Sequence, residues 1–308
     1  MSHDIHDMVR ANYSALARDR PARETEALAR IAASFGYSEQ ELSAIPAEAN
    51  LGVSCGNPVA LASLKPGETV LDLGCGGGMD VFLAAEKVGP QGRVIGLDMT
   101  AEMIALARAN AARRGDATVE FVEAPIEAMP LAEASIDCVI SNCVLNLVPD
   151  KDAALREIFR VLKPGGRLAV SDIALKAPLP GALEASVTAW VGCIAGAMTA
   201  EANREALQRA GFTDIAIIDA GADLNVYKEA GQDGCCAPSP ASPIEASSCC
   251  GPAKAPAQAS PAAAACCGPA KAPAADLHTA MGETFRDIDL NAYAASVKLF
   301  AIKPAASS

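Results

Sequence analysis

The 308-residue sequence has no long apolar run and no concentration of positive charge. No stretch reaches the ~18 uninterrupted apolar residues of a membrane helix, so no membrane association is expected. The start, Met1–Asp4, has no basic run followed by an apolar one, which predicts that there is no secretory signal and that the protein is cytoplasmic. The net charge is −12 at pH 7, and without a basic stripe no binding to nucleic acid is expected.

Cysteine, in contrast, is abundant, with 11 residues in the chain. Apolar residues make up 51% of the sequence, which predicts a packed globular core. In a reducing compartment, cysteines serve more often as ligands or catalysts than as structural disulfides. The cysteines are therefore the first candidates for the chemistry of this protein.

From Thr69 onward, short apolar strands alternate with amphipathic helices, which is typical of βαβ units around a parallel sheet. The sequence therefore predicts an α/β, doubly wound, Rossmann-like fold. Lys163–Gly166 is predicted to be a turn between a helix and a strand. The predicted strands are Thr69–Leu73, Arg93–Leu97, Thr118–Val122, Ile136–Ser141, Arg167–Ser171, Thr213–Asp219 and Ser296–Ile302.

Differences in composition divide the chain into five parts. Residues 1–64 are interpreted as an N-terminal helical cover, in which Tyr13 either closes a ligand site or packs on the sheet. The core of the fold is expected over residues 65–175, and a substrate-site segment with the sixth strand over 176–228. Residues 229–275 are predicted to be a flexible insertion, and residues 276–308 hold the final strand and a tail.

The predicted insertion consists mostly of Ala, Pro, Ser, Gly and Cys, and such a segment buries too little apolar surface to offset its ordering entropy. The sequence Cys-Cys-Gly-Pro-Ala-Lys-Ala-Pro-Ala occurs twice in it, at Cys249–Ala257 and Cys266–Ala274. A third Cys-Cys pair is Cys235–Cys236. A zinc site is disfavoured, because the pairs lack Cys-x₂-Cys spacing and no histidine lies nearby.

A glycine-rich turn follows the first predicted strand. Gly74 and Gly76 allow the backbone to approach a ligand closely, and the helix that follows offers N–H groups to an anion such as a carboxylate. Asp72 would repel a pyrophosphate but attract an amino group, while Asp98 can accept hydrogen bonds from two ribose hydroxyls. The alternative is a dinucleotide-binding domain in which these acids only cap turns.

Three cysteines lie in separate segments that are all expected to border one crevice. Cys143 follows the fourth strand at the carboxyl edge of the sheet, where ligands bind in folds of this kind. Cys193 lies between the fifth and sixth strands, and Cys55 lies before the first. Cys138 is expected only to be buried in a strand, and Cys75, within the glycine turn, is given no role.

The stretch from Val70 to Asp172, with Leu-Lys-Pro-Gly-Gly-Arg-Leu at residues 162–168, resembles class I methyltransferases. This resemblance implies a sheet with an antiparallel last strand, substrate-site additions, and S-adenosylmethionine as the methyl donor. The residues that match cofactor contacts in that family are Asp72, Gly74, Gly76, Asp98, Met99, Ile126, Glu127 and Asn142.

A narrower resemblance is carried by Asn-Cys-Val-Leu-Asn-Leu-Val-Pro-Asp-Lys at residues 142–151, Gly-Cys at 192–193 and Cys-Gly-Asn-Pro at 55–58. These segments are similar to arsenite methyltransferases. The resemblance implies that thiolates of Cys55, Cys143 and Cys193 bind As(III), that arsenite and methylarsenite are substrates in arsenic detoxification, and that a thiol reductant, glutathione or thioredoxin, is a co-substrate. Some members carry another cysteine after the glycine turn, where this chain has Val81, so Cys55 is expected to supply the extra thiol for binding or redox resolution.

This chemistry is physically consistent with the sequence. As(III) is soft, so thiolates select it, and three sulfur ligands leave its lone pair free to attack a sulfonium methyl group held nearby. Arsenic carries no proton that a base would have to remove. His3, His6 and His278 all lie outside the motifs, so no catalytic histidine is expected.

Two other functions stay open. Another small-molecule methyltransferase, such as a quinone C-methylating enzyme, would not need Cys143 and Cys193. A metalloid-sequestering protein would depend on the Cys-Cys pairs of residues 229–275 and not on Asp98. Within an enzyme, the same pairs could instead pass As(III) inward, because a tether raises its effective concentration at the site.

Overall fold

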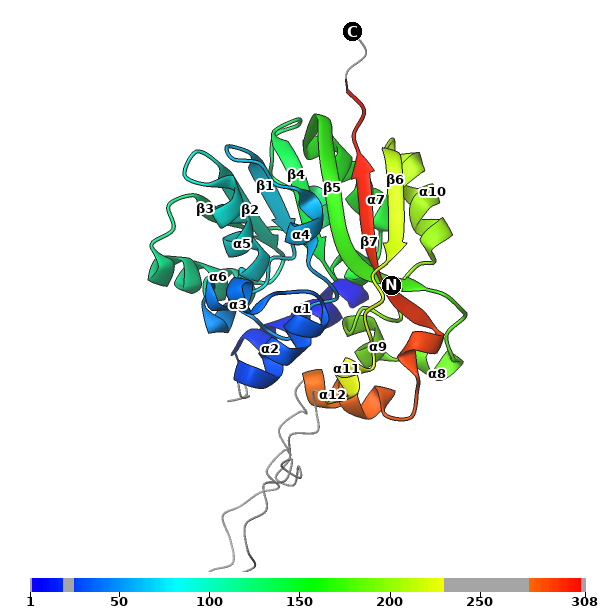
Figure 1. The fold of residues 1–308 in the computed structure, drawn as a ribbon. Helices are drawn as coiled ribbons and strands as arrows, with labels where there is room; N and C mark the ends of the chain where they lie inside the picture. Colours follow the sequence, from blue (N-terminus) through cyan, green and yellow to red (C-terminus); the bar gives the residue numbers. More distant parts are fainter. Residues whose placement is uncertain (1, 19–24, 230–276, 306–308) are drawn as a thin grey trace, which may run out of the picture.

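The computed structural model describes residues 2–18, 25–229 and 277–305, and its centre is a seven-stranded sheet in the order β3-β2-β1-β4-β5-β7-β6 (Figure 1). Strands β1 to β5 are parallel, and β7 runs antiparallel to both of its neighbours. The prediction of a doubly wound α/β sheet with an antiparallel last strand is therefore confirmed. The strands are β1 Thr69–Leu73, β2 Arg93–Asp98, β3 Val119–Glu123, β4 Ile136–Asn142, β5 Leu162–Leu175, β6 Thr213–Asp219 and β7 Ala294–Ile302.

Successive side chains of each strand point to opposite faces of the sheet and pack into two core layers, one on each face. In β1, Val70 packs with α4, α5 and α6 on one face, whereas Leu71 and Leu73 pack with α7 and α10 on the other. Cys138 in β4 is fully buried in the first of these layers, as predicted. The helices named here are α4 Pro58–Ala62, α5 Met79–Val88, α6 Ala101–Arg114, α7 Lys151–Val161 and α10 Ala200–Ala210.

A third group of helices covers the carboxyl end of the parallel strands, below the sheet in Figure 1. It combines segments from both ends of the chain, and its buried core contains Cys55, Cys143 and Cys193. This group comprises α1 Ser2–Arg18, α2 Thr25–Ser34, α8 Gly181–Glu184, α9 Val187–Val191, α11 Val226–Glu229 and α12 Leu277–Phe285. Short elements elsewhere are α3 Glu39–Ser43 and the 3₁₀ turns η1 Ala47–Ala49, η2 Ile126–Ala128, η3 Leu145–Leu147 and η4 Leu290–Ala292.

The predicted strand bounds agree with the structure to within two residues, except in β5, which is longer than predicted at both ends. The third strand begins at Val119 and not at Thr118. The predicted turn at Lys163–Gly166 lies inside β5, where the register with β4 shifts between Ile136 and Cys138. Gly165 takes φ +80° there and donates its N–H to the Lys303 carbonyl at 2.9 Å, so the four residues form a bulge that stays in the sheet.

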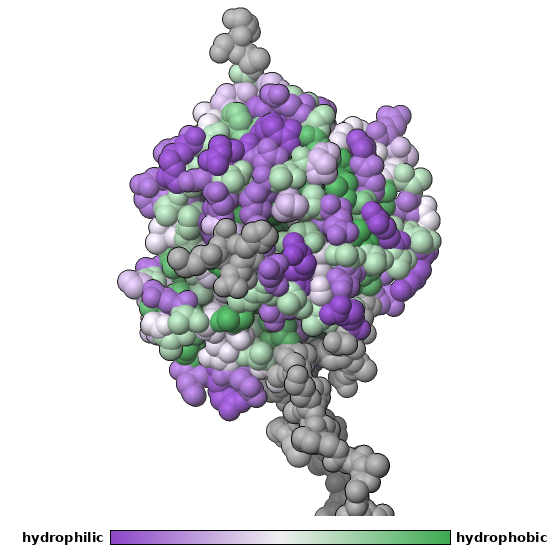
Figure 2. Space-filling model, turned by 180° about the vertical axis from the view of Figure 1, so that it is seen from behind, coloured by the Kyte–Doolittle hydropathy of each residue, from purple (hydrophilic) through white to green (hydrophobic). Residues whose placement is uncertain are grey.

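On the face of the molecule seen in Figure 2, hydrophilic and apolar residues alternate over short distances. Among the described residues, none of the helices has the length and apolar character to span a bilayer. Residues 230–275 of the predicted insertion lie outside the described part of the chain. The division into five parts therefore stays a prediction.

Candidate active site

The glycine-rich turn after β1 is held against the end of β2. Gly74 and Gly76 have φ values of +63° and +51°, in the left-handed region that glycine adopts most readily. A Cβ atom on Gly74 would lie 2.3 Å from a methyl carbon of Val144, so no larger residue fits. The Gly76 N–H donates to Asp98 at 3.1 Å, and the Thr100 N–H donates to the other Asp98 oxygen at 2.9 Å. Asp98 therefore fixes the turn as well as facing the crevice.

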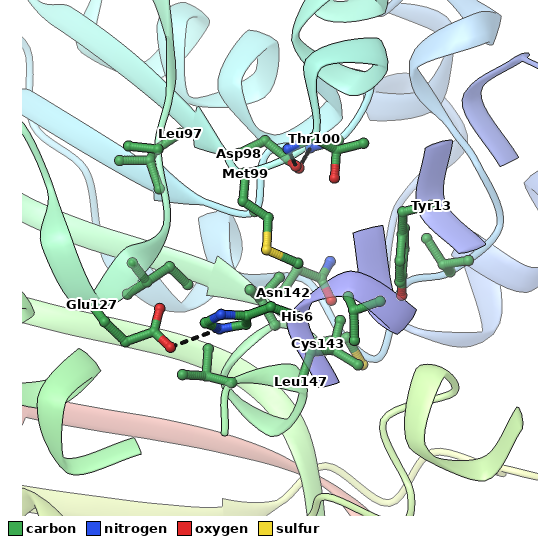
Figure 3. A pocket seen from close by; sticks show the side chains of 18 residues that line it. His6, Tyr13, Leu97, Asp98, Met99, Thr100, Glu127, Asn142, Cys143 and Leu147 are labelled. Atoms are coloured by element: carbon green, nitrogen blue, oxygen red, sulfur yellow. Dashed lines mark hydrogen bonds and ion pairs between the residues drawn. The ribbon is translucent and has the colours of Figure 1, made fainter. Parts of the chain in front are cut away.

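A pocket of about 710 Å³ opens in front of this turn (Figure 3). Seven of the eight predicted cofactor residues line it together with Cys143. The eighth, Asp72, lines an adjoining pocket of about 400 Å³. The structure thus brings all the predicted cofactor residues around one continuous region, and those in the larger pocket are Gly74, Gly76, Asp98, Met99, Ile126, Glu127 and Asn142.

Helix α1 closes the larger pocket. His6 and Tyr13 extend from it into the space (Figure 3), and His6 bonds to Glu127 at 2.9 Å. Tyr13 donates to the Val191 carbonyl at 3.2 Å, so it belongs to the cover of the pocket and not to the sheet. No local pattern in the sequence places His6 at this pocket, because 121 residues separate it from Glu127. The expectation that no histidine is catalytic stays a prediction.

The adjoining pocket contains a second buried acid, Asp80, which was not among the predicted site residues. Asp72 and Asp80 are only 2% and 6% exposed. The Tyr37 hydroxyl donates to Asp80 at 2.7 Å, and the Asn142 amide donates to it at 3.2 Å. Burial raises the pKa of Asp80 to about 6. Burial also raises the pKa of Asp72 well above its ordinary value, and the negative charges of Asp80 and Asp98 raise it further. Two such acids suit a cationic group.

The affinity for a cationic amino group in this pocket should depend on pH. An ammonium ion favours the charged form of Asp80, whose pKa of about 6 leaves it mostly neutral at pH 5. The affinity for S-adenosylhomocysteine, the demethylated form of the expected cofactor, should therefore fall by about tenfold between pH 7 and pH 5. Calorimetric titration at a series of pH values measures this change. The Asp80→Asn variant is the control, and an unchanged pH slope in it would contradict the assignment.

The three predicted ligand cysteines meet in one buried cluster. The sulfur atoms of Cys55, Cys143 and Cys193 and a carboxylate oxygen of Asp172 all lie within 4.8 Å of one another. Cys55 and Cys143 form a disulfide with a Cα–Cα distance of 5.6 Å, whereas Cys193 is a free thiol. The expectation that cysteines of this chain serve more often as ligands or catalysts than as structural disulfides stays a prediction, and this pair joins two of the expected ligand positions. The Tyr227 hydroxyl lies 3.5 Å from the Cys55 sulfur.

Both Cys143 and Cys193 have left-handed backbone conformations, with φ values of +57° and +64°. Such conformations are unfavourable for residues other than glycine and persist where the surroundings impose them. The Cys143 N–H donates to the Ser171 carbonyl at 2.8 Å. The Asn146 amide donates to the Cys193 carbonyl at 3.2 Å and to Asp172 at 2.8 Å. These bonds hold the backbone of both cysteines next to Asp172.

Asp172, which sequence reasoning also missed as a site residue, controls the charge near Cys193. Burial raises the pKa of Asp172 to about 7, although backbone hydrogen bonds and Lys151 oppose this. Burial raises the pKa of the Cys193 thiol well above its ordinary value, and the charge of Asp172 raises it further. Cys193 is therefore protonated near neutral pH, and a ligand that binds its sulfur must displace that proton.

Comparison with known proteins gives a consistent result. Residues 64–211 match the family described as a methyltransferase domain. The chain is 46% identical over 183 residues to an arsenite methyltransferase from Halobacterium salinarum, covering 59% of this chain and 47% of that protein. It is 35% identical over 223 residues to an arsenite methyltransferase from Aquipseudomonas alcaligenes, covering 70% and 64%. The chain thus spans about half to two thirds of the length of these curated relatives.

A crystal structure of an arsenic(III) S-adenosylmethionine methyltransferase from Chlamydomonas reinhardtii matches with 31% identity and a TM-score of 0.50. The match covers 67% of this chain and 69% of that one. The sheet order and the glycine turn define the Rossmann-like class I methyltransferase fold. Within that class, the chain belongs to the arsenic(III) S-adenosylmethionine methyltransferase family.

Proposed function

We propose that this protein transfers methyl groups from S-adenosylmethionine to As(III) bound by Cys55, Cys143 and Cys193, and that this reaction detoxifies arsenite. The observation that supports it most is the buried cluster of three sulfur atoms within 4.8 Å, in which Cys143 also lines the pocket of the glycine turn. A soft, thiophilic acceptor and the expected methyl donor would therefore meet at Cys143.

The residues around the larger pocket fit S-adenosylmethionine. Gly74 leaves room for the ligand, Asp98 faces the crevice at the end of β2, and Asp72 and Asp80 form an acidic pocket for the amino group. Ile126 and Glu127 would border the adenine. The cofactor, when bound, supplies an electrophilic sulfonium methyl group. Helix α1 places Tyr13 over this space, a cover that would limit the access of water to the reacting groups.

Binding of arsenite to the three cysteines would need no external base. At each cysteine an As–S bond forms and an As–O bond breaks, and the thiol proton leaves with the hydroxyl group as water. The proton that burial keeps on Cys193 is removed in this way. After three such exchanges the arsenic lone pair is the nucleophile. Methylarsenite, with one As–C bond in place of an exchangeable hydroxyl, needs only two sulfur ligands.

A thiol reductant is part of the proposal. Methylation at the lone pair raises arsenic from the trivalent to the pentavalent state, and two electrons must return it to As(III) for another round. Two cysteine thiols supply them by forming a disulfide, and Cys55 and Cys143 are joined in this way. Two thiols of glutathione, or the dithiol of thioredoxin, then reduce that disulfide and become oxidised. We place this cycle in the cytoplasm, where such reductants are present.

The direct test is incubation of the reduced protein with methyl-labelled S-adenosylmethionine, arsenite and either glutathione or thioredoxin with its reductase, followed by speciation of arsenic. Labelled methylarsenicals are expected, and arsenite should disappear for more than one turnover only when a reductant is present. A demethylated quinone offered in parallel decides between the two methyltransferase functions. Label in the quinone and none in arsenic would reject the proposal.

Deletion of Gly234–Ala275, with a short turn in its place, should leave a folded and active enzyme. The deleted stretch contains a single large aliphatic residue, Ile244, and α11 and α12 on either side of it belong to the same core cluster. Thermal unfolding and initial methylation rates at saturating arsenite should match those of the full chain. A variant that folds and binds S-adenosylhomocysteine but no longer handles arsenite would favour metalloid sequestration by the Cys-Cys pairs.

A further inference from the structure

The side-chain amide of Asn142, the last residue of β4, lies between the two halves of the candidate site. On one side its nitrogen donates to the Tyr37 hydroxyl at 2.8 Å and to Asp80 at 3.2 Å. Tyr37 in turn donates to the other Asp80 oxygen at 2.7 Å. Asn142 is thus part of the acidic pocket in which the amino group of the cofactor would bind.

On its other side, Asn142 holds the backbone that carries Cys55. Its carbonyl oxygen accepts the Cys55 N–H at 3.0 Å, and its nitrogen donates to the Gly56 carbonyl at 2.9 Å. The Cys55 carbonyl accepts the Ser296 hydroxyl. Gly56 lies so close to β5 that a Cβ atom on it would be 2.6 Å from the Cβ of Ser171. The Asn142 carboxamide is therefore one of the groups that fix the backbone of Cys55, together with Ser296 and the packing of Gly56 against Ser171.

Binding of a cation in the acidic pocket should change the hydrogen bonds that the Asn142 carboxamide makes. The two hydrogens of the Asn142 nitrogen serve three acceptors, the Tyr37 hydroxyl, Asp80 and the Gly56 carbonyl. A cation that binds the Asp80 oxygen would leave both hydrogens to Tyr37 and Gly56. The Gly56 bond then no longer shares a hydrogen, so the backbone that carries Cys55 is held more firmly and less ordering entropy is lost when the second ligand binds. The two ligands should therefore bind with positive cooperativity.

We infer that Asn142 is a positioning residue that couples the cofactor pocket to the arsenic ligand Cys55, so that either ligand strengthens the binding of the other. This inference rests on the proposed function, because it requires that arsenite binds at the cysteine cluster. The coupling does not involve Cys193, whose carbonyl is held by Asn146.

The experiment measures a coupling factor, the ratio of S-adenosylhomocysteine affinities with and without saturating arsenite. The full chain is kept reduced with a phosphine, and calorimetry with this demethylated cofactor avoids turnover. In the unmodified protein the factor should be about fivefold or more, the lower end of typical coupling between two sites. In Asn142→Ala it should fall to about one, because the link between Asp80 and Cys55 is gone.

Asn110→Ala is the matched control. Asn110 is also a buried carboxamide, and it donates to the Gly77 carbonyl of the glycine turn at 2.8 Å. Its replacement should weaken the binding of S-adenosylhomocysteine but keep the coupling factor. Tyr37→Phe supplies a second variant of nearly unchanged shape, which removes the hydroxyl between Asp80 and Asn142 and should lower the factor at least about twofold.

The outcomes separate the inference from the function on which it rests. A factor of one in the unmodified protein, with arsenite demonstrably bound, overturns the coupling and leaves the methyltransferase proposal intact. So does a full factor in both Asn142→Ala and Tyr37→Phe. Failure of the reduced, unmodified protein to bind arsenite overturns the inference together with the proposed function. Loss of the factor in Asn110→Ala as well as Asn142→Ala also overturns it, since general damage to the turn would then be the cause.

Discussion

Replacement of Cys193 by serine is expected to lower the rate of arsenite methylation by roughly a hundredfold or more, which corresponds to about 3 kcal/mol of lost transition-state stabilisation. Serine has nearly the same volume, but its hydroxyl is a hard and poorly ionised ligand that does not replace a thiolate on As(III). Arsenic held by two sulfur atoms is no longer confined to the orientation in which its lone pair faces the methyl group.

The fold and the cofactor affinity should survive this change. The Cys193 thiol donates to the Cys143 carbonyl at 2.7 Å, and a serine hydroxyl can donate to the same acceptor. Cys193 does not line the pocket of the glycine turn, so the affinity for S-adenosylhomocysteine should stay within about twofold. Cys138→Ser is the matched control, because Cys138 is a buried free thiol in another core layer, and its replacement should leave the rate unchanged.

Assays on two substrates assign the cysteines individually. Cys143→Ser should lose activity on arsenite and methylarsenite, as Cys193→Ser should. Cys55→Ser should lose activity on arsenite but keep methylation of methylarsenite, which needs one protein sulfur fewer. Full activity of either the Cys143 or the Cys193 variant on both substrates would reject the arsenic site and leave an ordinary small-molecule methyltransferase.

The strands of the sheet could be predicted because each is marked by the residues of its own short segment. Seven short apolar runs, separated by turn residues, gave all seven strands, and the carboxyl edge of a parallel sheet is where ligands bind. That rule predicts Cys143 at the crevice, and the structure has it in the lining of the pocket. The exception was Lys163–Gly166, which has the composition of a turn, yet its backbone pairs in β5 because β4 accommodates a shift in register.

The residues that sequence reasoning missed are those that reach the site through tertiary packing. His6 belongs to α1, whose path over the sheet is fixed by contacts such as the Ser14–Glu102 and Arg18–Glu102 hydrogen bonds. Asp172 lies within a long apolar strand, and nothing local distinguishes it from a strand residue that faces solvent. Asp80 did carry a signal, since it lies two residues after the last glycine of the turn, in the first turn of α5.

The disulfide illustrates a different limit. Cys55 and Cys143 are 88 residues apart, and a pattern of cysteines does not specify which pairs approach within bonding distance. The structure adds that the two cysteines are joined through positions that are also expected to bind the substrate. One pair can thus alternate between arsenic ligands and an oxidised state, which is why a reductant accompanies the proposed reaction.

Asp98→Ala is expected to weaken the binding of S-adenosylhomocysteine by about 100-fold, the scale of a few kcal/mol that charge-assisted hydrogen bonds contribute. The change removes the acceptor expected for the ribose hydroxyls. It also removes the two hydrogen bonds that the N–H groups of Gly76 and Thr100 donate to Asp98. Asp98→Asn should weaken this binding less, but still substantially. The NH2 group of the asparagine would face the N–H of either Gly76 or Thr100, so one of these two hydrogen bonds would be lost.

Arsenite binding to the cofactor-free protein should be nearly unaffected in both Asp98 variants, because Asp98 is not part of the cysteine cluster. Trp190 is the single tryptophan of the chain and lies three residues before Cys193, so its fluorescence can report arsenite binding while calorimetry reports the cofactor. An unchanged affinity for S-adenosylhomocysteine in Asp98→Ala would reject this carboxylate as a cofactor contact. If arsenite binding instead weakened in parallel without any cofactor present, the loss would lie in the fold, because the two pockets communicate through Asn142 and not through Asp98.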